Sequence, residues 1–314
     1  MRKYILIAMV ATASACARVA PVAEPTVMLQ GNAAAPKGRV ANHVVVISID
    51  GLRPDAIRRF KAPTLSRLMN EGRYSLSAQT IQLSLTLPSH TSMLTGVDSD
   101  QHRVTWNSDK TATRGYVAVP TIFALARNAG FTTAAFFSKT KFQQLASPGS
   151  LDYTRGPSRS PTPWSSARTV ELVVKHLENA KPNLLFVHLA DVDFAGHTFD
   201  WMGHTYGMAV RDVDRSLTTL LAVIDQKFGA GRYTVIITSD HGGHGKTHGT
   251  TQKLDTTIPW IVWGAGVRKG DTLSGIRTMD TAATALWMLG LDAPANWTGR
   301  ALTSAFEPAL SLAR

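Results

Sequence analysis

The sequence predicts an α/β fold in which a mostly parallel central sheet is covered by helices on both faces. Two observations lead to this expectation. Apolar segments typical of strands alternate along the chain with segments typical of helices, which is the order that builds parallel sheets. In addition, residues 44–49 form a nearly continuous apolar run and residues 234–238 are β-branched throughout, as expected for strands buried on both faces.

The first half of the chain begins with the strand at 44–49. A helix is expected at 63–71, because it starts with a proline and ends before Gly72. A second helix with apolar spacing follows at 120–128, and an apolar strand is expected at 131–137.

The second half opens with a Pro- and Ser-rich segment, 154–165, which predicts a surface loop. A long amphipathic helix is expected at 208–228 and the β-branched strand at 233–238. The remaining elements continue the alternation and are a helix at 165–178, a strand at 184–189, a short strand at 260–263 and a final helix at 281–289.

Composition indicates a soluble globular protein, since 44% of the 314 residues are hydrophobic and 18% are charged. The formal net charge of +11 favours anionic partners such as phosphate esters, anionic lipid or nucleic acid. The sequence has no run of five or more Lys or Arg and no nucleic-acid-binding motif. A small phosphate-ester substrate therefore fits the charge without any need for nucleic acid.

The first residues resemble an export signal. Arg2 and Lys3 precede an apolar stretch, and the small residues of a cleavage site follow it. Cys16, the one cysteine, resembles the cysteine of a bacterial lipobox, so two outcomes are open: lipid attachment at Cys16, which would tether the protein to a membrane, or ordinary cleavage near Ala15. We expect an exported protein, periplasmic or anchored to the outer membrane as a lipoprotein in a bacterium.

Three regions follow from this pattern. Residues 1–16 are expected to be the export signal, and the Ala- and Pro-rich residues 17–40 a flexible leader. Residues 41–314 are expected to form one catalytic domain. The sequence gives no indication of the oligomeric state.

Residues with carboxylate and imidazole side chains follow several of the expected strands. Asp50 comes directly after the first strand, and Asp240 and His241 come directly after the strand at 233–238. Asp193 and His197 are four residues apart, a spacing that lets both face one ion. Because sites in such sheets lie beyond the carboxyl ends of the strands, these side chains predict a metal centre there.

The remaining ligand is left open by the residues alone. His244 and His248 both follow Asp240, and both precede a glycine. Asp191 is a rival to Asp193, while His188 lies inside an apolar strand and is expected to be a core histidine.

Thr86 is the expected nucleophile. Pro88 suits the first turn of a helix, which would place Thr86 near the positive helix end. Coordination to a divalent metal would lower the pKa of its hydroxyl and make an alkoxide accessible. Ser84, Ser89 and Thr91 are chemically possible alternatives.

Taken together, these motifs resemble the alkaline phosphatase superfamily, and within it the nucleotide pyrophosphatase/phosphodiesterase (type I phosphodiesterase) branch. The matching stretches run from residue 44 to 249 in the family's order and are "VVVISIDGLRPD", "TLPSHTSMLTG", "HRVTWN", "DFAGH", "SDHGGHG" and "THG". The resemblance implies an alkaline-phosphatase-like three-layer sandwich and a two-zinc phosphoric ester hydrolase.

The resemblance also implies roles for individual residues. One zinc ion would be held by Asp193, His197 and His248, which favours His248 over His244. The other would be held by Asp50, Asp240, His241 and Thr86. Asn107 would donate to a phosphate oxygen. Attack by Thr86 would form a phospho-threonine, and a second in-line displacement would give net retention at phosphorus.

The substrate class is less closely defined. We expect a phosphodiesterase or nucleotide pyrophosphatase, and the alternative is a phosphomonoesterase, in which Lys139 and Lys141 would bind the terminal phosphate oxygens. The run "TLPSH" departs from the sulfatase pattern, so a formylglycine sulfatase is not expected. A non-catalytic metal- or phosphate-binding lipoprotein and a phosphoglycerate-mutase-type transferase are further rivals.

Overall fold

The computed structural model describes residues 39–158 and 162–307. The expected export signal, Cys16 and nearly all of the expected leader lie outside the described residues. Val40, which was expected in the leader, donates its backbone N–H to the carbonyl of Met288 at 3.0 Å. The packed fold therefore includes at least this residue of the predicted leader.

The core of the fold is a seven-stranded sheet with the order β2-β7-β6-β1-β5-β3-β4. The pairings make β7 antiparallel to both of its neighbours, while the other six strands run in one direction. The mostly parallel sheet is thus confirmed. The strands are β1 (His43–Ile49), β2 (Arg73–Gln79), β3 (Thr133–Phe136), β4 (Tyr153–Arg155), β5 (Leu184–Leu189), β6 (Tyr233–Thr238) and β7 (Thr257–Gly264).

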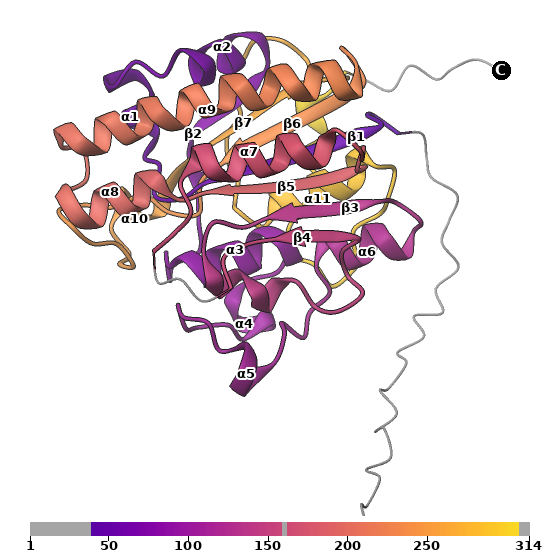
Figure 1. Cartoon of the computed structure of the whole chain (residues 1–314), viewed down its shortest axis with the longest axis horizontal. Coiled ribbons are helices and arrows are strands. Elements are labelled where there is room, and N and C mark those ends of the chain that lie inside the picture. The colour runs from indigo at the N-terminus through magenta and orange to yellow at the C-terminus, as the bar shows by residue number, and fades with distance from the viewer. Residues whose placement is uncertain (1–38, 159–161, 308–314) are drawn as a thin grey trace, which may run out of the picture. The chain divides into compact units, whose positions relative to one another are not determined.

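Helices cover both faces of the sheet, as expected for strands that are apolar on both sides (Figure 1). In β1, Val45, Ile47 and Ile49 pack against one helix layer, while Val44 and Val46 pack against the other. The first layer consists of α1 (Pro54–Arg59), α2 (Pro63–Glu71), α7 (Ser166–Leu177), α8 (Asp191–Phe199) and α9 (His204–Phe228).

The second layer is built mainly from α3 (Thr86–Thr95), α6 (Ile122–Asn128) and α11 (Asp280–Met288). Shorter elements complete the described fold and are α4 (Ser99–His102), α5 (Thr111–Arg114), α10 (Lys253–Thr256) and the 3₁₀ helices η1 (Thr140–Leu145) and η2 (Thr303–Ala305). The arrangement is a three-layer α/β sandwich, in agreement with the predicted fold class.

Two strands were not expected from the sequence. The β2 segment "RYSLSAQ" alternates polar and apolar residues, and it pairs only with β7, with a register irregularity between Ser75 and Ala78. The β4 strand has three exposed residues and overlaps the segment predicted to be a loop. Both are sheet edges, where a strand needs no continuous apolar run. The β7 strand also extends well beyond the predicted 260–263.

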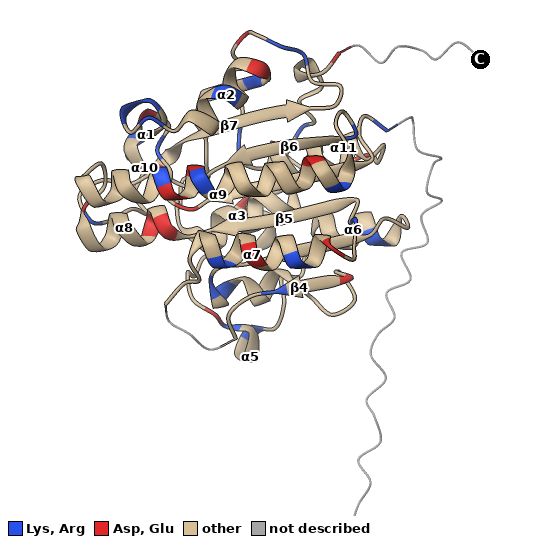
Figure 2. Ribbon diagram, turned by 45° about the horizontal axis from the view of Figure 1, so that its top comes forward, with Lys and Arg blue, Asp and Glu red and all other residues tan. Residues whose placement is uncertain are grey.

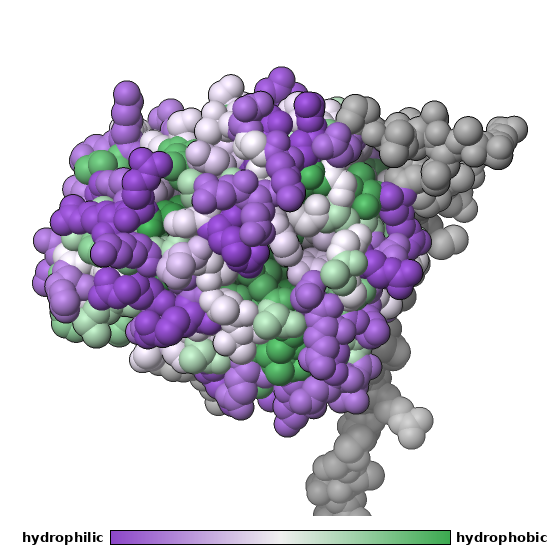
Figure 3. All heavy atoms as spheres, turned by 90° about the horizontal axis from the view of Figure 1, so that it is seen from above, coloured by the Kyte–Doolittle hydropathy of each residue, from purple (hydrophilic) through white to green (hydrophobic). Residues whose placement is uncertain are grey.

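The charged side chains lie outside the central strands. Strands β5, β6 and β7 carry no Lys, Arg, Asp or Glu, whereas the exposed faces of α7 and α9 carry both signs (Figure 2). On the face drawn in Figure 3, hydrophilic side chains predominate, with smaller apolar patches between them. Within the described parts of the chain, no helix is both long and apolar enough to cross a membrane.

The strand directions decide where a site can form. The carboxyl ends of β1, β3, β5 and β6 all reach the same edge of the sheet, because these strands are parallel. The segment after β2 and the start of the antiparallel β7 reach this edge as well. The expected site residues that follow strands therefore lie at this edge.

A buried aspartate in α9 links two helices of the first layer and allows a stability test. The carboxylate of Asp214 accepts hydrogen bonds from the backbone N–H groups of Thr64 and Leu65, both at 2.9 Å, at the start of α2. Asp214→Ala removes the acceptors of two otherwise unpaired N–H groups. We expect a loss of about 2 kcal/mol in the free energy of unfolding, measured by urea denaturation.

Asp212→Ala provides the matched control, because Asp212 lies on the same helix but is exposed and pairs only with Arg215. This control should change the free energy of unfolding by less than about 0.5 kcal/mol. Equal effects of the two substitutions would contradict the capping role of Asp214.

Candidate active site

Three carboxylates meet at the carboxyl edge of the sheet. Asp50 follows β1, Asp240 follows β6, and Asp193 lies in the first turn of α8, just after β5. All three are buried, with exposed fractions of 0%, 0% and 3%. Since three buried negative charges repel one another, this arrangement calls for compensating positive charge.

The first group consists of Asp50, Asp240 and His241, whose ligand-type atoms all lie within 4.8 Å of one another. The Nε2 atom of His241 lies 3.3 Å from Oδ1 of Asp50 and 3.2 Å from Oδ2 of Asp240. The hydroxyl of Thr86 lies 3.3 Å from the same Nε2 atom. The four residues predicted to surround one ion are thus brought together.

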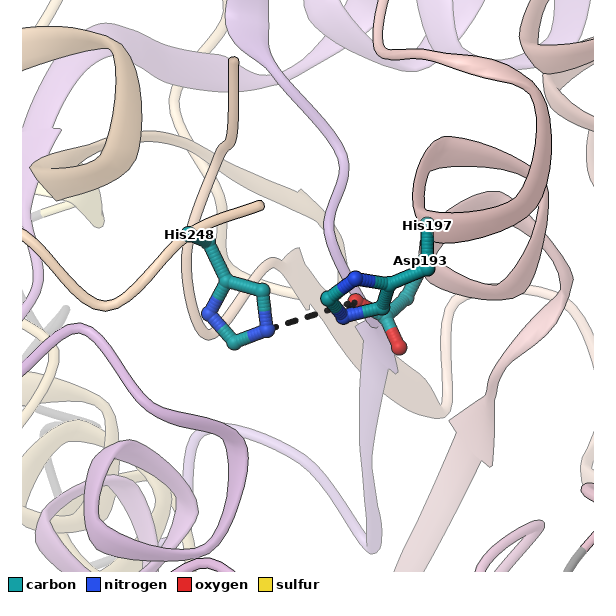
Figure 4. Close-up of side chains that lie close together, drawn as sticks. All are labelled: Asp193, His197 and His248. Atoms are coloured by element: carbon teal, nitrogen blue, oxygen red, sulfur yellow. Dashed lines mark ion pairs between the residues drawn. The ribbon is translucent and has the colours of Figure 1, made fainter. Parts of the chain in front are cut away.

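The second group consists of Asp193, His197 and His248 (Figure 4). Oδ1 of Asp193 lies 3.4 Å from Nε2 of His197 and 3.7 Å from Nε2 of His248. His244 is not part of this group, because its Nδ1 atom pairs with Asp255 at 2.7 Å. The geometry therefore agrees with His248 as the third member, as expected.

The three imidazoles share one orientation. Each donates its Nδ1–H to a backbone carbonyl over 2.8–2.9 Å, that of Gly242 for His241, Ser84 for His248 and Lys246 for His197. The Nε2 atom of each ring therefore faces the carboxylates. This use of a carbonyl to fix the second ring nitrogen is typical of histidines that bind metals.

The carboxylate oxygens that face these Nε2 atoms have no hydrogen-bond donor. Oδ1 of Asp50, Oδ1 of Asp193 and Oδ2 of Asp240 are buried and unpaired within the described structure. Each lies within 3.4 Å of an imidazole nitrogen that also faces inward. Unpaired buried carboxylate oxygens beside inward-facing imidazoles suit divalent cations, so the residues present fit two metal ions.

Close packing between β1 and α8 holds the two groups together. Gly51 follows Asp50 with φ +71°, and a Cβ atom there would lie 2.9 Å from Cα of Asp193. The Gly51 carbonyl accepts a hydrogen bond from Nε1 of Trp201 at 3.0 Å. Gly196 leaves room for the same indole, since its own Cβ would lie 2.5 Å from the ring. Gly51 thus lets Asp50 and Asp193 come close.

Thr86 is the first residue of α3 and is 1% exposed. The other hydroxyls considered for its role point elsewhere: Ser84 donates to the carbonyl of Thr250 at 2.7 Å, and Thr91 donates to that of Leu87 at 2.7 Å. The hydroxyl of Ser89 is buried without a partner in the described structure. Within the described structure, the hydroxyl of Thr86 is the one of these four that contacts a member of either group, namely His241.

Asn107 and Lys141 lie beside Thr86. The amide oxygen of Asn107 accepts hydrogen bonds from the backbone N–H of Leu87 and from Nζ of Lys141, both at 3.0 Å. These bonds fix the amide with its oxygen occupied and leave its NH₂ group available as a donor. Lys139 does not lie beside Asn107 as Lys141 does. Its Nζ atom pairs with carboxylates of both groups.

The electrostatics of the site favour positive charge. Burial would raise the pKa of Asp50, but the Lys139 ammonium, the hydrogen bond from His188 and the adjacent His241 imidazole hold it well below its usual value. Burial would lower the pKa of His241, but Asp240 and Asp50 raise it to about 9. Burial and the charge of His241 lower the pKa of His248 to about 4. Nε2 of His241 thus favours a positive charge, from a proton or from a metal ion.

Several residues at the site had a different or no expected role. His188 is buried as expected, but its Nε2–H donates to Asp50 at 3.0 Å while its Nδ1 atom accepts from the backbone of Ser138 at 3.4 Å. His90 donates its Nδ1–H to the carbonyl of Thr86 at 2.8 Å. The spacing of four residues between Thr86 and His90 was the signal in the sequence that could have identified it.

The residues considered as alternative metal ligands form hydrogen bonds outside the two groups. Asp191 accepts hydrogen bonds from the backbone N–H and the hydroxyl of Ser166 at the start of α7. Asp255 accepts from His244 at 2.7 Å and from the hydroxyl of Thr250 at 2.7 Å. Asp255 thus ties the loop that carries His248 to the rest of the site, which the sequence did not predict.

Comparisons with known proteins show the family and the fold. The profile of the family described as type I phosphodiesterase / nucleotide pyrophosphatase matches residues 44–259. The structure is similar to an inactive threonine-to-alanine variant of murine ectonucleotide pyrophosphatase/phosphodiesterase 5 in complex with AMP. The TM-score is 0.72 at 16% identity, over 85% of this chain and 100% of that one. A 2-O GAG sulfatase has a TM-score of 0.68 at 16% identity, over 84% of this chain and 74% of that one. Both likenesses show the fold.

Curated relatives of this chain include eukaryotic proteins. GPI ethanolamine phosphate transferase 1 of Neurospora crassa is 24% identical over 289 residues, 78% of this chain and 28% of that protein. The protein of the same name from Homo sapiens is 23% identical over 279 residues, 79% of this chain and 29% of that protein. The chain thus spans less than a third of the length of these relatives. They contradict the expected location, so the prediction of a bacterial periplasmic or outer-membrane lipoprotein was wrong.

The two candidate histidines give a direct test of the second group. His248→Ala removes an inward-facing Nε2 atom from the second group, so we expect the protein to bind less metal. His244→Ala removes a partner of Asp255 and of Gln252, but Asp255 keeps its bonds to Thr250, so we expect the metal content to stay unchanged. The measurement is the metal content of zinc-loaded protein after gel filtration. An unchanged metal content in His248→Ala would remove His248 from the metal centre.

Proposed function

Because this chain belongs to the type I phosphodiesterase/nucleotide pyrophosphatase family of the alkaline phosphatase superfamily, we propose that it is a two-zinc enzyme that cleaves phosphate esters through a phospho-threonine. Family and fold establish a phosphoester hydrolase or transferase. The observation that carries the finer proposal is the position of the Thr86 hydroxyl, 3.3 Å from His241, beside two groups of metal-ligand side chains. Residues 41–314 would form the catalytic domain.

Each zinc ion would be held by one of the two groups, with Asp50, Asp240, His241 and Thr86 around one and Asp193, His197 and His248 around the other. When bound, two such ions would stabilise negative charge on the attacking and leaving oxygens of an in-line displacement. The unpaired oxygens of Asp50, Asp193 and Asp240 support this assignment.

Thr86 would act as the nucleophile. Its oxygen forms a bond to phosphorus while the bond to the leaving alcohol or nucleotide breaks, and the threonine proton is transferred to solvent or to the leaving group. Water then forms a bond to phosphorus, and the bond to Thr86 breaks and restores the hydroxyl. Two inversions give net retention. The threonine-to-alanine variant of the murine relative is described as inactive, which supports this role.

Asn107 and Lys141 would hold the phosphoryl oxygens. The amide oxygen of Asn107 is occupied by two donors, so its NH₂ group is the part that can face a substrate oxygen. Burial and the charge of Lys139 lower the pKa of Lys141 to about 8, which leaves it mostly protonated at neutral pH. Both side chains thus supply donors where negative charge develops.

A phosphomonoesterase is the second candidate, and Lys141 favours it. A phosphate monoester carries one more negative charge at phosphorus than a diester, so it gains more from a cation beside Thr86. We keep the diesterase as the first candidate because the family is named for that reaction. The curated relatives are named as transferases, and the same phospho-threonine would serve if an alcohol replaced water as acceptor. The intact set of site residues argues against a non-catalytic binding protein.

The nucleophile is tested with a matched pair of hydroxyl deletions in α3. Thr86→Ala should lower the hydrolysis of bis-(p-nitrophenyl) phosphate by about 10³-fold or more, with bound zinc retained. Ser89→Ala removes a nearby buried hydroxyl that has no partner and should keep nearly full activity. Full activity in Thr86→Ala would rule out this nucleophile.

The substrate class is tested by comparing p-nitrophenyl phosphate, its bis-ester and thymidine-5′-monophosphate p-nitrophenyl ester with zinc supplied. We expect Lys141→Met to lower kcat/KM for the monoester by about tenfold more than for the diesters, because the lost cation faces the additional charge. Adding an alcohol such as ethanolamine and measuring its phosphorylated product separates transfer from hydrolysis. Equal losses on all three substrates would exclude a charge-specific role for Lys141.

A further inference from the structure

Lys139 contacts a carboxylate of each of the two groups of metal-ligand side chains. Its Nζ atom lies 2.6 Å from Oδ2 of Asp50 and 2.5 Å from Oδ2 of Asp193. The lysine follows β3, where the backbone N–H of Ser138 donates to Nδ1 of His188 and the Ser138 hydroxyl donates to the His188 carbonyl. Since His188 itself donates to Asp50, the lysine and the carboxylate are fixed by one network.

The two oxygens of each carboxylate have separate surroundings. In both Asp50 and Asp193 the ammonium contacts Oδ2, while Oδ1 is unpaired and faces the imidazoles. The ammonium therefore lies outside the positions that suit metal ions. It binds the far oxygen of each carboxylate and leaves the near oxygen free.

The contact of Lys139 with the two buried carboxylates is expected to stabilise the fold. Removing one partner of a buried charge pair is strongly destabilising, because it leaves a buried charge uncompensated. The Lys139 ammonium lies against both carboxylates, so the buried charges compensate one another. Two of its three N–H groups are directed at carboxylates, whereas Lys141 has no carboxylate partner among the described residues and contacts Asn107.

We infer that Lys139 is a positioning residue, a fixed counter-cation that joins the two carboxylates and turns their free oxygens toward the imidazoles, and that it does not bind the substrate phosphate. This role differs from that of Lys141, although the two lysines are two residues apart. The inference rests on the proposed function only for its kinetic consequence. Its structural part concerns the metal-free protein and needs no turnover.

The main test is thermal unfolding of the metal-free protein, prepared with a chelator. Lys139→Met should lower the melting temperature by roughly 5–15 °C, because two buried carboxylates lose their shared cation. Lys141→Met is the matched control and should change it by less than about 2 °C. Lys139→Arg should recover most of the loss, since a guanidinium can donate to both carboxylates.

A double substitution separates pairing from general damage. Adding Asp193→Asn to Lys139→Met should cost less than the sum of the two single changes, because the pair is already broken. If the Lys139→Met protein can be purified only with zinc bound, the chelator is added at a temperature at which the wild type stays folded. Unfolding of the variant alone would then show the same loss of stability. Zinc should reduce the difference in melting temperature between Lys139→Met and the wild type, because the ions supply positive charge to both carboxylates.

The kinetic readout distinguishes positioning from substrate binding. With saturating zinc, we expect Lys139→Met to lower kcat and to leave KM for bis-(p-nitrophenyl) phosphate within about threefold. A metal-free Lys139→Met protein that melts with the wild type would overturn the inference, and so would additive effects in the double variant. A raised KM with an unchanged melting temperature would make Lys139 a substrate contact. An inactive wild type would refute the proposed function but leave the melting test intact.

Discussion

The convergence of three buried carboxylates at one edge of the sheet is the constraint on which the rest of the site depends. Parallel strands end together, so Asp50 after β1, Asp193 after β5 and Asp240 after β6 necessarily meet. Their mutual repulsion and loss of hydration oppose folding. The surrounding histidines and Lys139 offset this repulsion, and divalent cations, which the site fits, would offset it further.

The compensation couples distant segments of the chain. His248 is oriented by the carbonyl of Ser84 and His197 by that of Lys246, each far from its histidine in sequence, whereas His241 donates to the carbonyl of its neighbour Gly242. The loop that carries His248 is held in turn by Asp255, and Gly51 lets β1 approach α8. Two of the three imidazoles, those of His197 and His248, therefore depend on a backbone carbonyl from another segment, so the geometry of the site depends on how these segments pack.

The sequence was sufficient to predict the features that depend on neighbouring residues along the chain. Continuous apolar runs identified β1, β5 and β6, and the acids and imidazoles that follow them could be placed because strand ends define one edge. It failed at β2 and β4, since edge strands lack the apolar signal, and at the contacts of Asp255 and Lys139, which depend on tertiary packing. The assignment of His248 required a family resemblance, because His244 has the same local sequence context.

The candidate site residues and the hollow beside them come from different parts of the fold. The three carboxylates, His197, His241 and Thr86 lie just after strands or on α3 and α8, while His248 lies on the loop after β6. Beside Lys139, a hollow of about 290 Å³ is lined instead by loop and edge-strand residues, among them Tyr116, Phe137 and Arg155. Loops and sheet edges vary more readily than buried strands. Proteins named as a pyrophosphatase/phosphodiesterase and a sulfatase share this fold, and loops and sheet edges are the parts in which such proteins can differ most readily.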